Sequence, residues 1–298
     1  MKARLPSCLF HAQACRRPFR HNRLPVYSLR VNLSVVLITY NEESNLARTL
    51  ASVQPMVREG TGEIVVVDSG STDRTVEIAR SFGARVFAEE WKGYSAQKNS
   101  AIEKASGDWI LSLDADEELN HGAAQVIERI LGPDAEKYAT VSAVWFARKN
   151  HFLGRWIRHG GFYPDRKLRL FRRGQAMFSA RAVHETVSTN GRTLIAEHDF
   201  SLREDVALIH HSYPTLSDYI DHMNRYSSLG AEMIVAEGRK RFSVMNIAIR
   251  PWFTFFYNYF LRLGFLDGRE GLLLHLYHAI YVSWKYAKAW ELRSARKP

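Results

Sequence analysis

The chain has 298 residues, of which 46% are hydrophobic and 24% charged, and its formal net charge is +10. This composition is typical of one large folded domain or two modest ones, and it excludes a wholly disordered chain and a collagen-like fibre. The two cysteines, Cys8 and Cys15, both precede the first predicted strand, which excludes a disulfide framework and a four-cysteine zinc site.

The positive charge is concentrated at the two ends of the chain. Residues 1–30 carry +7 and residues 238–298 carry +8, whereas residues 31–237 carry −5. We expect residues 1–30 to be a basic, disordered extension or to lie outside the natural protein. Residues 31–237 are expected to form the folded domain, and residues 238–298 a separate basic segment.

The elements predicted in the first part of the domain alternate between strand and helix. Strands are predicted at Leu33–Ile38, Glu63–Val67, Ala84–Phe87 and Trp109–Leu113. Helices are predicted over residues 41–53, between the capping cluster 71–73 and Gly83, and over residues 94–105. This order predicts an α/β fold with a parallel sheet and right-handed crossovers. Ligands of such sheets bind beyond the carboxyl ends of the strands.

The predicted elements become mixed after residue 116. A helix is expected at residues 122–131, strand-like runs at Val141–Arg148 and Lys167–Phe171, and a helix at residues 215–238.

The C-terminal segment is rich in aromatic side chains. Residues 242–290 hold 14 of the 36 Phe, Trp and Tyr residues, and they include two apolar stretches, 252–261 and 272–290. Neither stretch is typical of a membrane span. Aromatic residues flanked by Arg and Lys favour helices that lie in the headgroup region of a membrane. A helical hairpin packed on the domain and a dimer interface are the alternatives.

Two carboxylates follow the fourth predicted strand. Asp114 and Asp116 are separated by one small residue, so both can converge on one cation beyond the strand end. Magnesium takes one or two protein carboxylates together with substrate phosphate oxygens, and manganese accepts the same ligands. Two solvated loop acids are the alternative interpretation.

Polar residues also follow the first two strands. The segments are Thr39-Tyr-Asn-Glu42 and Asp68-Ser-Gly-Ser-Thr-Asp73, and Gln97-Lys98-Asn99 lies in the third helix. Ser69 and Gly70 allow close backbone approach before a helix N-terminus, which favours anions. The chain contains neither the dinucleotide-binding nor the P-loop glycine pattern.

The order of these four segments closely resembles that of family 2 glycosyltransferases, which have the GT-A fold and use nucleotide-sugar donors with a divalent metal. The resemblance covers residues 33–117. It continues through residues 152–156, 169–172, 183–185 and 210–213, which look like the bacterial lipopolysaccharide-core β-1,4-glucosyltransferase branch.

The resemblance implies a role for each motif residue. Thr39, Tyr40 and Glu42 would line the nucleoside site, Asp68 would contact the base, and Lys98 would lie near the base or phosphates. Asp114 would lie near the ribose and metal, Asp116 would bind Mn²⁺ or Mg²⁺, and His210 would complete the metal site, although a buried structural histidine is the alternative.

An inverting transfer also needs a base that deprotonates the acceptor hydroxyl. Glu185 is the first candidate, because it matches the acidic position of related enzymes, and Asp165 is the second. Arg155, Trp156, Arg158, Arg169 and Arg172 are basic or aromatic residues that could hold an anionic acceptor, with ordinary ion pairs as the alternative.

The sequence therefore predicts an inverting, metal-dependent glycosyltransferase that moves glucose from UDP-glucose to a lipopolysaccharide-core or similar glycolipid acceptor. We expect it at the cytoplasmic membrane surface, on the inner face. A polyprenyl-phosphate glycosyltransferase and a nucleotidyltransferase are the alternatives. A nucleic-acid-binding protein is motivated only by the basic ends, and we expect no nucleic-acid partner.

Overall fold

A computed structural model describes residues 32–57, 60–132, 135–179, 187–200, 202, 205–238 and 243–294. The expected disordered extension at residues 1–30 lies outside these residues, and so does the base candidate Glu185.

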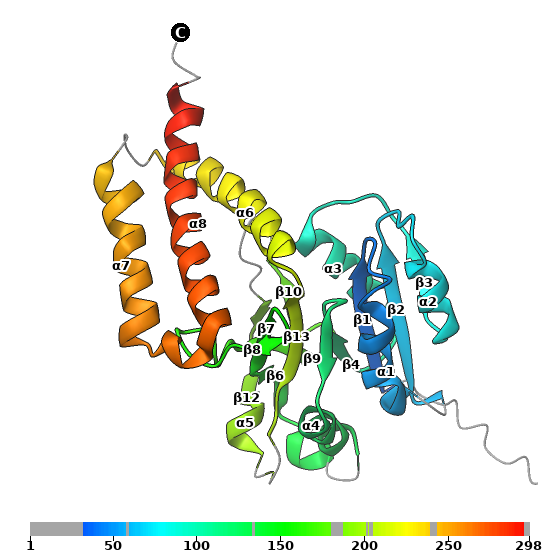
Figure 1. The fold of residues 1–298 in the computed structure, drawn as a ribbon. Coiled ribbons are helices and arrows are strands. Elements are labelled where there is room, and N and C mark those ends of the chain that lie inside the picture. The colour runs from blue at the N-terminus through cyan, green and yellow to red at the C-terminus, as the bar shows by residue number, and fades with distance from the viewer. Residues whose placement is uncertain are drawn as a thin grey trace, which may run out of the picture. The chain divides into compact units, whose positions relative to one another are not determined.

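The larger of the sheets has seven strands in the order β12-β6-β9-β4-β1-β2-β3 (Figure 1). Its parallel half consists of β1 (Leu33–Thr39), β2 (Gly62–Asp68), β3 (Arg85–Ala88) and β4 (Trp109–Ser112). Its other half contains β9 (Lys167–Arg172), antiparallel to β4 and to β6 (Val141–Phe146), and β12 (Arg192–Ile195), parallel to β6. The mainly parallel sheet confirms the predicted α/β fold.

Helices connect the parallel strands. They are α1 (Leu46–Val57), α2 (Thr75–Ser81) and α3 (Tyr94–Glu103), and α4 (His121–Leu131) follows β4. The first helix begins five residues later than predicted, because Asn41 adopts a left-handed backbone (φ 55°) and its side chain accepts a hydrogen bond from Thr72 N. The polar segment after β1 is thereby held as a loop at the sheet edge.

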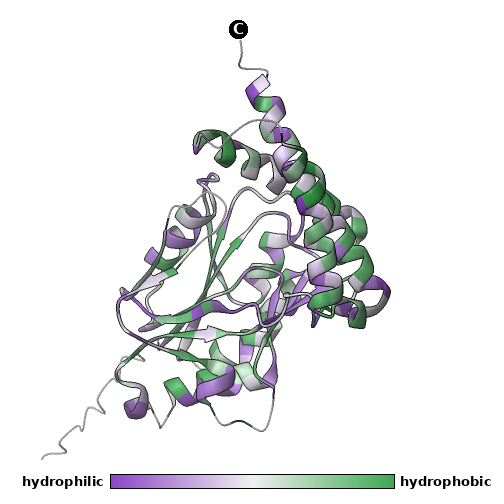
Figure 2. Ribbon diagram, turned by 90° about the vertical axis from the view of Figure 1, so that its left-hand side faces the viewer, coloured by the Kyte–Doolittle hydropathy of each residue, from purple (hydrophilic) through white to green (hydrophobic). Residues whose placement is uncertain are grey.

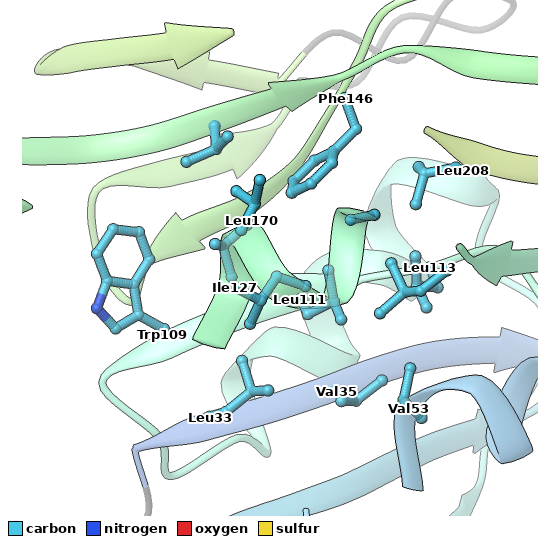
Figure 3. Close-up of a cluster of buried hydrophobic side chains, with 14 of the residues drawn as sticks. Leu33, Val35, Val53, Trp109, Leu111, Leu113, Ile127, Phe146, Leu170 and Leu208 are labelled. Carbon is cyan, nitrogen blue, oxygen red and sulfur yellow. The ribbon is translucent and has the colours of Figure 1, made fainter. Parts of the chain in front are cut away.

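One main core lies between this sheet and its helices (Figure 3). Leu33, Val35, Leu111, Leu113 and Leu170 are fully buried sheet residues, which meet buried side chains of α1 and α4. The short β-branched and leucine-rich runs are therefore the strands because both of their faces are covered.

A second sheet places three distant segments together. Its order is β5 (Glu117–Leu119), β13 (Leu208–Tyr213), β7 (Arg148–Phe152) and β8 (Arg155–Trp156). The run Val141–Arg148, expected as one strand, is divided at Ala147 between β6 and β7, which belong to different sheets. A small antiparallel hairpin of β10 (Ala176–Phe178) and β11 (Val187–Thr189) forms a separate two-stranded sheet that packs on a second core cluster. The remaining short helices are η2 (Ala135–Tyr138) and α5 (Ala196–Asp199).

The C-terminal part is helical. It comprises α6 (Leu216–Ala236), η3 (Met245–Ile249), α7 (Arg250–Phe256), η4 (Tyr257–Leu261), η5 (Gly264–Asp267) and α8 (Gly268–Ser294). The helix α8 packs along both α6 and α7 (Figure 1). Within the described ranges, every helix is too short or too polar to cross a membrane.

Two glycines allow α8 to pack closely on the rest of the fold. A Cβ at Gly160 would lie 1.9 Å from the His275 ring, and one at Gly264 would lie 2.3 Å from it. The neighbouring Asp267 is buried and accepts hydrogen bonds from the backbone N–H groups of Arg158 and His159. The loop that contains Gly160 is thus held against the C-terminal helices.

Candidate active site

The loops after β1 and β2 are hydrogen-bonded to each other. Thr39 Oγ1 donates to Asp68 Oδ2 at 2.8 Å, and Asn41 N donates to Ser71 Oγ at 2.9 Å. Glu42 N donates to Thr75 Oγ1 at 2.7 Å. Adjacent parallel strands bring both loops to one sheet edge, so the segments from the sequence form one surface.

Asp68 organises the second of these loops. Its Oδ1 accepts from Gly70 N at 3.0 Å and Ser71 N at 2.8 Å, and its Oδ2 accepts from Ser71 Oγ at 2.5 Å as well as from Thr39. Both carboxylate oxygens are therefore already engaged within the protein. A base that binds here would have to share these acceptors.

The other nucleoside-site candidates differ in exposure. The Tyr40 side chain is 59% exposed, so its ring is free to meet a ligand. Ser69 accepts a hydrogen bond from the buried Gln97 at 3.2 Å. Burial raises the pKa of Glu42, and repulsion from Asp116 adds to this, although a hydrogen bond from Asn45 opposes it. Glu42 therefore belongs to the same electrostatic environment as the acids after β4.

Asp114 lies within a group of cations. Lys98 Nζ is 2.7 Å from Asp114 Oδ1, and the Arg169 guanidinium pairs with Oδ2. Burial opposes ionisation, but Arg169 and Lys98 hold the pKa of Asp114 well below its usual range. Asp114 is therefore a fixed anion whose two oxygens both face protein cations.

Further acids balance the charge of this group. Arg169 also contacts the fully buried Glu117 at 2.6 Å, and Arg148 contacts the same Glu117 oxygen at 3.0 Å. The Arg148 guanidinium also pairs with Asp165, whose Oδ2 lies 2.6 Å from Arg148 Nη2. Three cations, Lys98, Arg148 and Arg169, thus face three carboxylates, Asp114, Glu117 and Asp165; we call these six residues the ionic cluster.

Asp165, the second base candidate, is a member of the ionic cluster. It pairs with Lys167 at 2.9 Å as well as with Arg148. Burial alone would raise the pKa of Asp165, but these cations lower it to about 2. A carboxylate of such low pKa accepts a proton poorly, so its surroundings suit orientation of Arg148 better than general-base catalysis.

Asp116 faces His210. Asp116 Oδ2 lies 3.1 Å from His210 Nε2, and the other ring nitrogen of His210 lies 2.7 Å from Asn150 Oδ1 and 2.6 Å from Ser212 Oγ. Burial opposes ionisation of Asp116, but His210 lowers the pKa of the carboxyl. The strand pairing of β5 with β13 brings these two residues together from 94 positions apart in the chain.

A carboxylate and an imidazole are both ligands for Mn²⁺, and a diphosphate could supply the remaining oxygens. Among the described residues, however, no group of three or more His, Cys, Asp and Glu side chains is placed to hold a metal ion. The protein alone thus offers two ligands, Asp116 and His210, and the donor set fits a metal that is shared with a substrate.

The hairpin next to Asp114 is anchored on α3. Asn99 exchanges two hydrogen bonds with the backbone of Phe178, at 2.9 and 3.0 Å, and Ser95 donates to the Ser179 carbonyl at 2.7 Å. The Phe178 ring lies 5.2 Å from Lys98 Nζ. The chain therefore enters the segment that contains Glu185 from a point beside the ionic cluster.

The expected acceptor residues have different surroundings. Arg169 is buried in the ionic cluster, and Arg172 donates to the Val141 carbonyl at 2.8 Å and covers the Trp109 ring. Arg155 and Arg158 are exposed, and the Trp156 ring lies between Arg158 and Lys149. Arg169 and Arg172 follow the ordinary ion-pair and packing alternative. Arg155 does so in part, since it lies 3.8 Å from Glu270, and Arg158 is exposed beside the Trp156 ring.

Sequence reasoning missed three polar residues of the site. Glu117 adjoins the Asp114–Asp116 motif, so its position in the chain was a usable signal. Arg148 and Asn150 reach the site only because β7 pairs with β13, a non-local contact that local pattern does not reveal.

Comparison with known proteins gives consistent matches. The model of the glycosyl transferase family 2 matches residues 34–190. An uncharacterized glycosyltransferase of Rickettsia bellii is 31% identical over 270 residues, which cover 89% of this chain and 88% of that protein. The lipopolysaccharide core biosynthesis glycosyltransferase LpsC of Rhizobium meliloti is 29% identical, covering 88% of this chain and 93% of LpsC.

Among solved structures, the mannosyltransferase PcManGT of Pyrobaculum calidifontis, in complex with GDP-Man and Mn²⁺, matches with a TM-score of 0.50 and 16% identity. The match covers 90% of this chain and 88% of that protein. At this identity the likeness concerns the fold alone, and it agrees with the mainly parallel sheet described above.

Proposed function

This chain belongs to glycosyltransferase family 2, and on that premise we propose that it transfers glucose from UDP-glucose to a lipopolysaccharide-core or similar glycolipid, with inversion at the anomeric carbon. The observation that carries the proposal is the meeting of Asp116, His210 and the ionic cluster beyond the carboxyl end of β4. The overall similarity to LpsC supports the choice of acceptor.

The donor nucleoside is proposed to bind over the joined loops after β1 and β2. Tyr40 offers an exposed ring on which a base can stack, and Asp68 and Thr39 offer polar atoms at the sheet edge. Ser69 and Glu42 border the same surface. Lys98, held by Asp114, would lie between this surface and the diphosphate.

Asp116 and His210 are proposed to hold a divalent ion, Mn²⁺ or Mg²⁺, together with the donor diphosphate. Such an ion supplies stabilisation of the charge that builds on the leaving nucleoside diphosphate. His210 is oriented for this role by Asn150 and Ser212, which bind its other ring nitrogen. Asp114, whose oxygens face protein cations, would act through Lys98 and the ribose rather than as the principal ligand.

Glu185 is proposed to take the proton from the acceptor hydroxyl. Its support is the anchored start of its segment beside Lys98 and the low pKa of Asp165, the competing candidate. Glu185→Gln should keep donor binding and remove transfer. An active Glu185→Gln variant would assign the base elsewhere.

An acceptor of this kind is embedded in a membrane. We therefore propose that the enzyme works as a peripheral protein at the inner face of the cytoplasmic membrane. A polyprenyl phosphate in the same membrane is the competing acceptor, and the mass of the product formed with each acceptor separates the two.

The decisive experiment is a nucleotide-sugar screen that measures UDP release with and without Mn²⁺. We expect UDP-glucose to be consumed in a metal-dependent way, and Asp116→Ala to lower the rate by about 10²-fold or more, since it removes charge stabilisation at the leaving group. Glu77→Ala, an exposed acid on α2, is the matched control and should leave the rate unchanged. Full activity of Asp116→Ala would refute the site, and release of pyrophosphate would indicate a nucleotidyltransferase.

A further inference from the structure

The exposed apolar side chains of the protein are concentrated in one segment. Within the described part of the chain, twelve of the twenty exposed large hydrophobic side chains lie between residues 244 and 266. Six of them repeat at a spacing of four along α7 and η4, which places them on one side of the helix. These six define the aromatic stripe: Trp252, Phe253, Phe256, Tyr257, Phe260 and Leu261.

The rings of the aromatic stripe lie against one another along the helix, and Phe260 also contacts the rings of Phe255 and Tyr259. The centroids of Trp252 and Phe256 are 5.6 Å apart, and those of Phe256 and Phe260 are 5.3 Å apart. Trp252 remains 65% exposed and Phe253 56% exposed. The intervening side of the helix is turned inward, as the contact of Tyr259 with His275 of α8 shows.

The second apolar stretch behaves differently. Leu274, Ala279, Val282 and Ala289 of α8 are buried, because α8 packs along α6. Figure 2 shows extensive hydrophobic ribbon on these C-terminal helices, but only part of it is solvent-exposed. Packing on α6 therefore buries one side of residues 272–290, while Leu272, Leu276 and Trp290 remain exposed, and the aromatic stripe faces solvent.

The positive charge around the aromatic stripe favours an anionic partner. Residues 239–266 contain five Lys and Arg residues and no Asp or Glu. Arg250 and Arg262 flank the aromatic stripe, and both are exposed, as is Arg269 just beyond it. A second copy of the chain docked through the same stripe would bring these like charges together, which costs free energy. An anionic lipid surface complements them, and aromatic side chains favour the headgroup level of a bilayer.

We propose that the aromatic stripe is the surface by which this protein docks on an anionic lipid bilayer, with its rings at the headgroup level and its arginines on lipid phosphates. The helix lies on the membrane and does not cross it. This inference rests on the proposed function only in that the acceptor is taken to be a lipid. The docking itself involves neither donor nor acceptor.

The test is flotation of the full-length protein with vesicles, without substrates. We expect the wild type to float with vesicles of phosphatidylcholine and phosphatidylglycerol, and less with phosphatidylcholine alone or at high salt. The triple variant Trp252→Gln, Phe253→Gln, Phe260→Gln should have a vesicle affinity at least roughly tenfold lower than that of the wild type, since it removes three inserted rings. These side chains are exposed, so circular dichroism should show an unchanged fold.

A matched control removes three exposed apolar side chains elsewhere: Trp91→Gln, Tyr94→Gln and Met177→Gln. This control should bind as the wild type does. An equal loss in the control, no loss in the stripe variant, or no wild-type binding would overturn the proposal. A wild-type dimer that the stripe variant converts to a monomer would overturn it in favour of self-association.

The outcome is separable from that of the donor screen. Glucose transfer without vesicle binding would remove the docking inference and the proposed peripheral location, and would leave the proposed transfer intact. Vesicle binding without consumption of UDP-glucose would remove the proposed donor alone.

Discussion

Arg169 is the most deeply buried cation of the ionic cluster. Its side chain is 5% exposed and contacts both Asp114 and Glu117, and Glu117 is fully buried. A buried carboxylate is tolerable only while its cation is present, because desolvation of an unpaired charge is costly. The cluster is therefore a structural requirement for the site as well as an electrostatic one.

We predict that Arg169→Met destabilises the protein by about 1.5–3 kcal/mol, since it removes charge-assisted hydrogen bonds to Asp114 and Glu117, which then keep only Lys98 and Arg148 as partners. Urea unfolding followed by circular dichroism measures the change in the free energy of unfolding. Arg74→Gln is the control, because both members of the Arg74–Glu77 pair are exposed, and it should leave the free energy of unfolding almost unchanged. Equal effects of the two variants would contradict the assigned role of Arg169.

At the scale of residues, the sequence predicted the acids after β4 and the lysine of α3, and the family resemblance implied that His210 lies near Asp116. The pairing of Asp114 with Lys98 and Arg169 was not predicted. Asp114 and Asp116 look equivalent in a motif, yet the first faces Lys98 and Arg169 and the second faces His210. Their difference arises from β9 and β13, strands that come more than 50 residues later. Local pattern carries no information about such partners.

Among the secondary-structure elements, Glu63 connects four segments of the parallel half. Its carboxylate accepts from Ser34 of β1 at 2.7 Å, from Ser106 N at 2.6 Å before β4, and from Arg85 of β3 at 2.5 Å. Burial opposes ionisation, but hydrogen bonds from Ser34, Ser106 and Arg85 lower the pKa of Glu63 to about 2. The ionised form therefore favours the folded state.

This predicts an acid-sensitive sheet. The usual pKa of 4.5 applies to the unfolded chain, so below it the unfolded state binds more protons than the folded state does. The stabilisation by Glu63, about 1–3 kcal/mol, should be complete above about pH 5 and decline as the pH falls toward 2. Urea unfolding at a series of pH values measures it. Glu63→Gln should flatten this dependence, and an unaltered slope would refute the assignment.

The predicted elements were most accurate where periodicity and burial agree. The four strands from residue 33 to residue 113 lie within one or two residues of their predicted ends. Most residues of β1, β2 and β4 are buried, whereas β3 is a partly exposed edge strand. The prediction failed at Val141–Arg148, where an uninterrupted apolar run crosses from one sheet to another. The point at which the run changes sheet depends on its partner strands elsewhere in the chain. The hydrophobicity of the run itself does not indicate that point.

At the scale of the molecule, Lys288 of α8 donates hydrogen bonds to α6. Its ammonium lies 2.8 Å from the Asn224 carbonyl, 2.7 Å from Ser227 Oγ and 2.9 Å from Ser228 Oγ. Burial lowers the pKa of Lys288. Since α6 follows β13, which carries His210, this contact links the C-terminal helices to the strand of the site.

Lys288→Met should therefore lower the stability of the whole folded unit by about 1–3 kcal/mol, since it removes charge-assisted hydrogen bonds at a packed interface. Thermal unfolding should remain a single transition at a lower midpoint. Lys92→Met, which loses only an exposed contact with Glu89, should lower the midpoint of thermal unfolding less. A separate early transition of the C-terminal helices would contradict this coupling.

The division of the chain at residues 237 and 238 remains a prediction. The packing of α8 on α6 crosses that boundary, as does the hydrogen bonding of Asp267 to the loop at Arg158 and His159. The C-terminal segment thus comes last in the sequence but packs together with the preceding domain. Its aromatic stripe faces away from that packing.

The fit of His275 between Gly160 and Gly264 has an evolutionary consequence. Any side chain at either glycine would collide with the ring, so neither position can change while the histidine remains. A smaller residue at 275 would remove this collision at both positions, but Gly160 would keep its left-handed backbone (φ 66°) and a Cβ at Gly264 would still lie 2.9 Å from the Asn258 carbonyl. In an alignment of relatives, both glycines should therefore be retained wherever the histidine is, and the three positions together would mark the relatives in which the C-terminal hairpin packs on the sheet domain in this way.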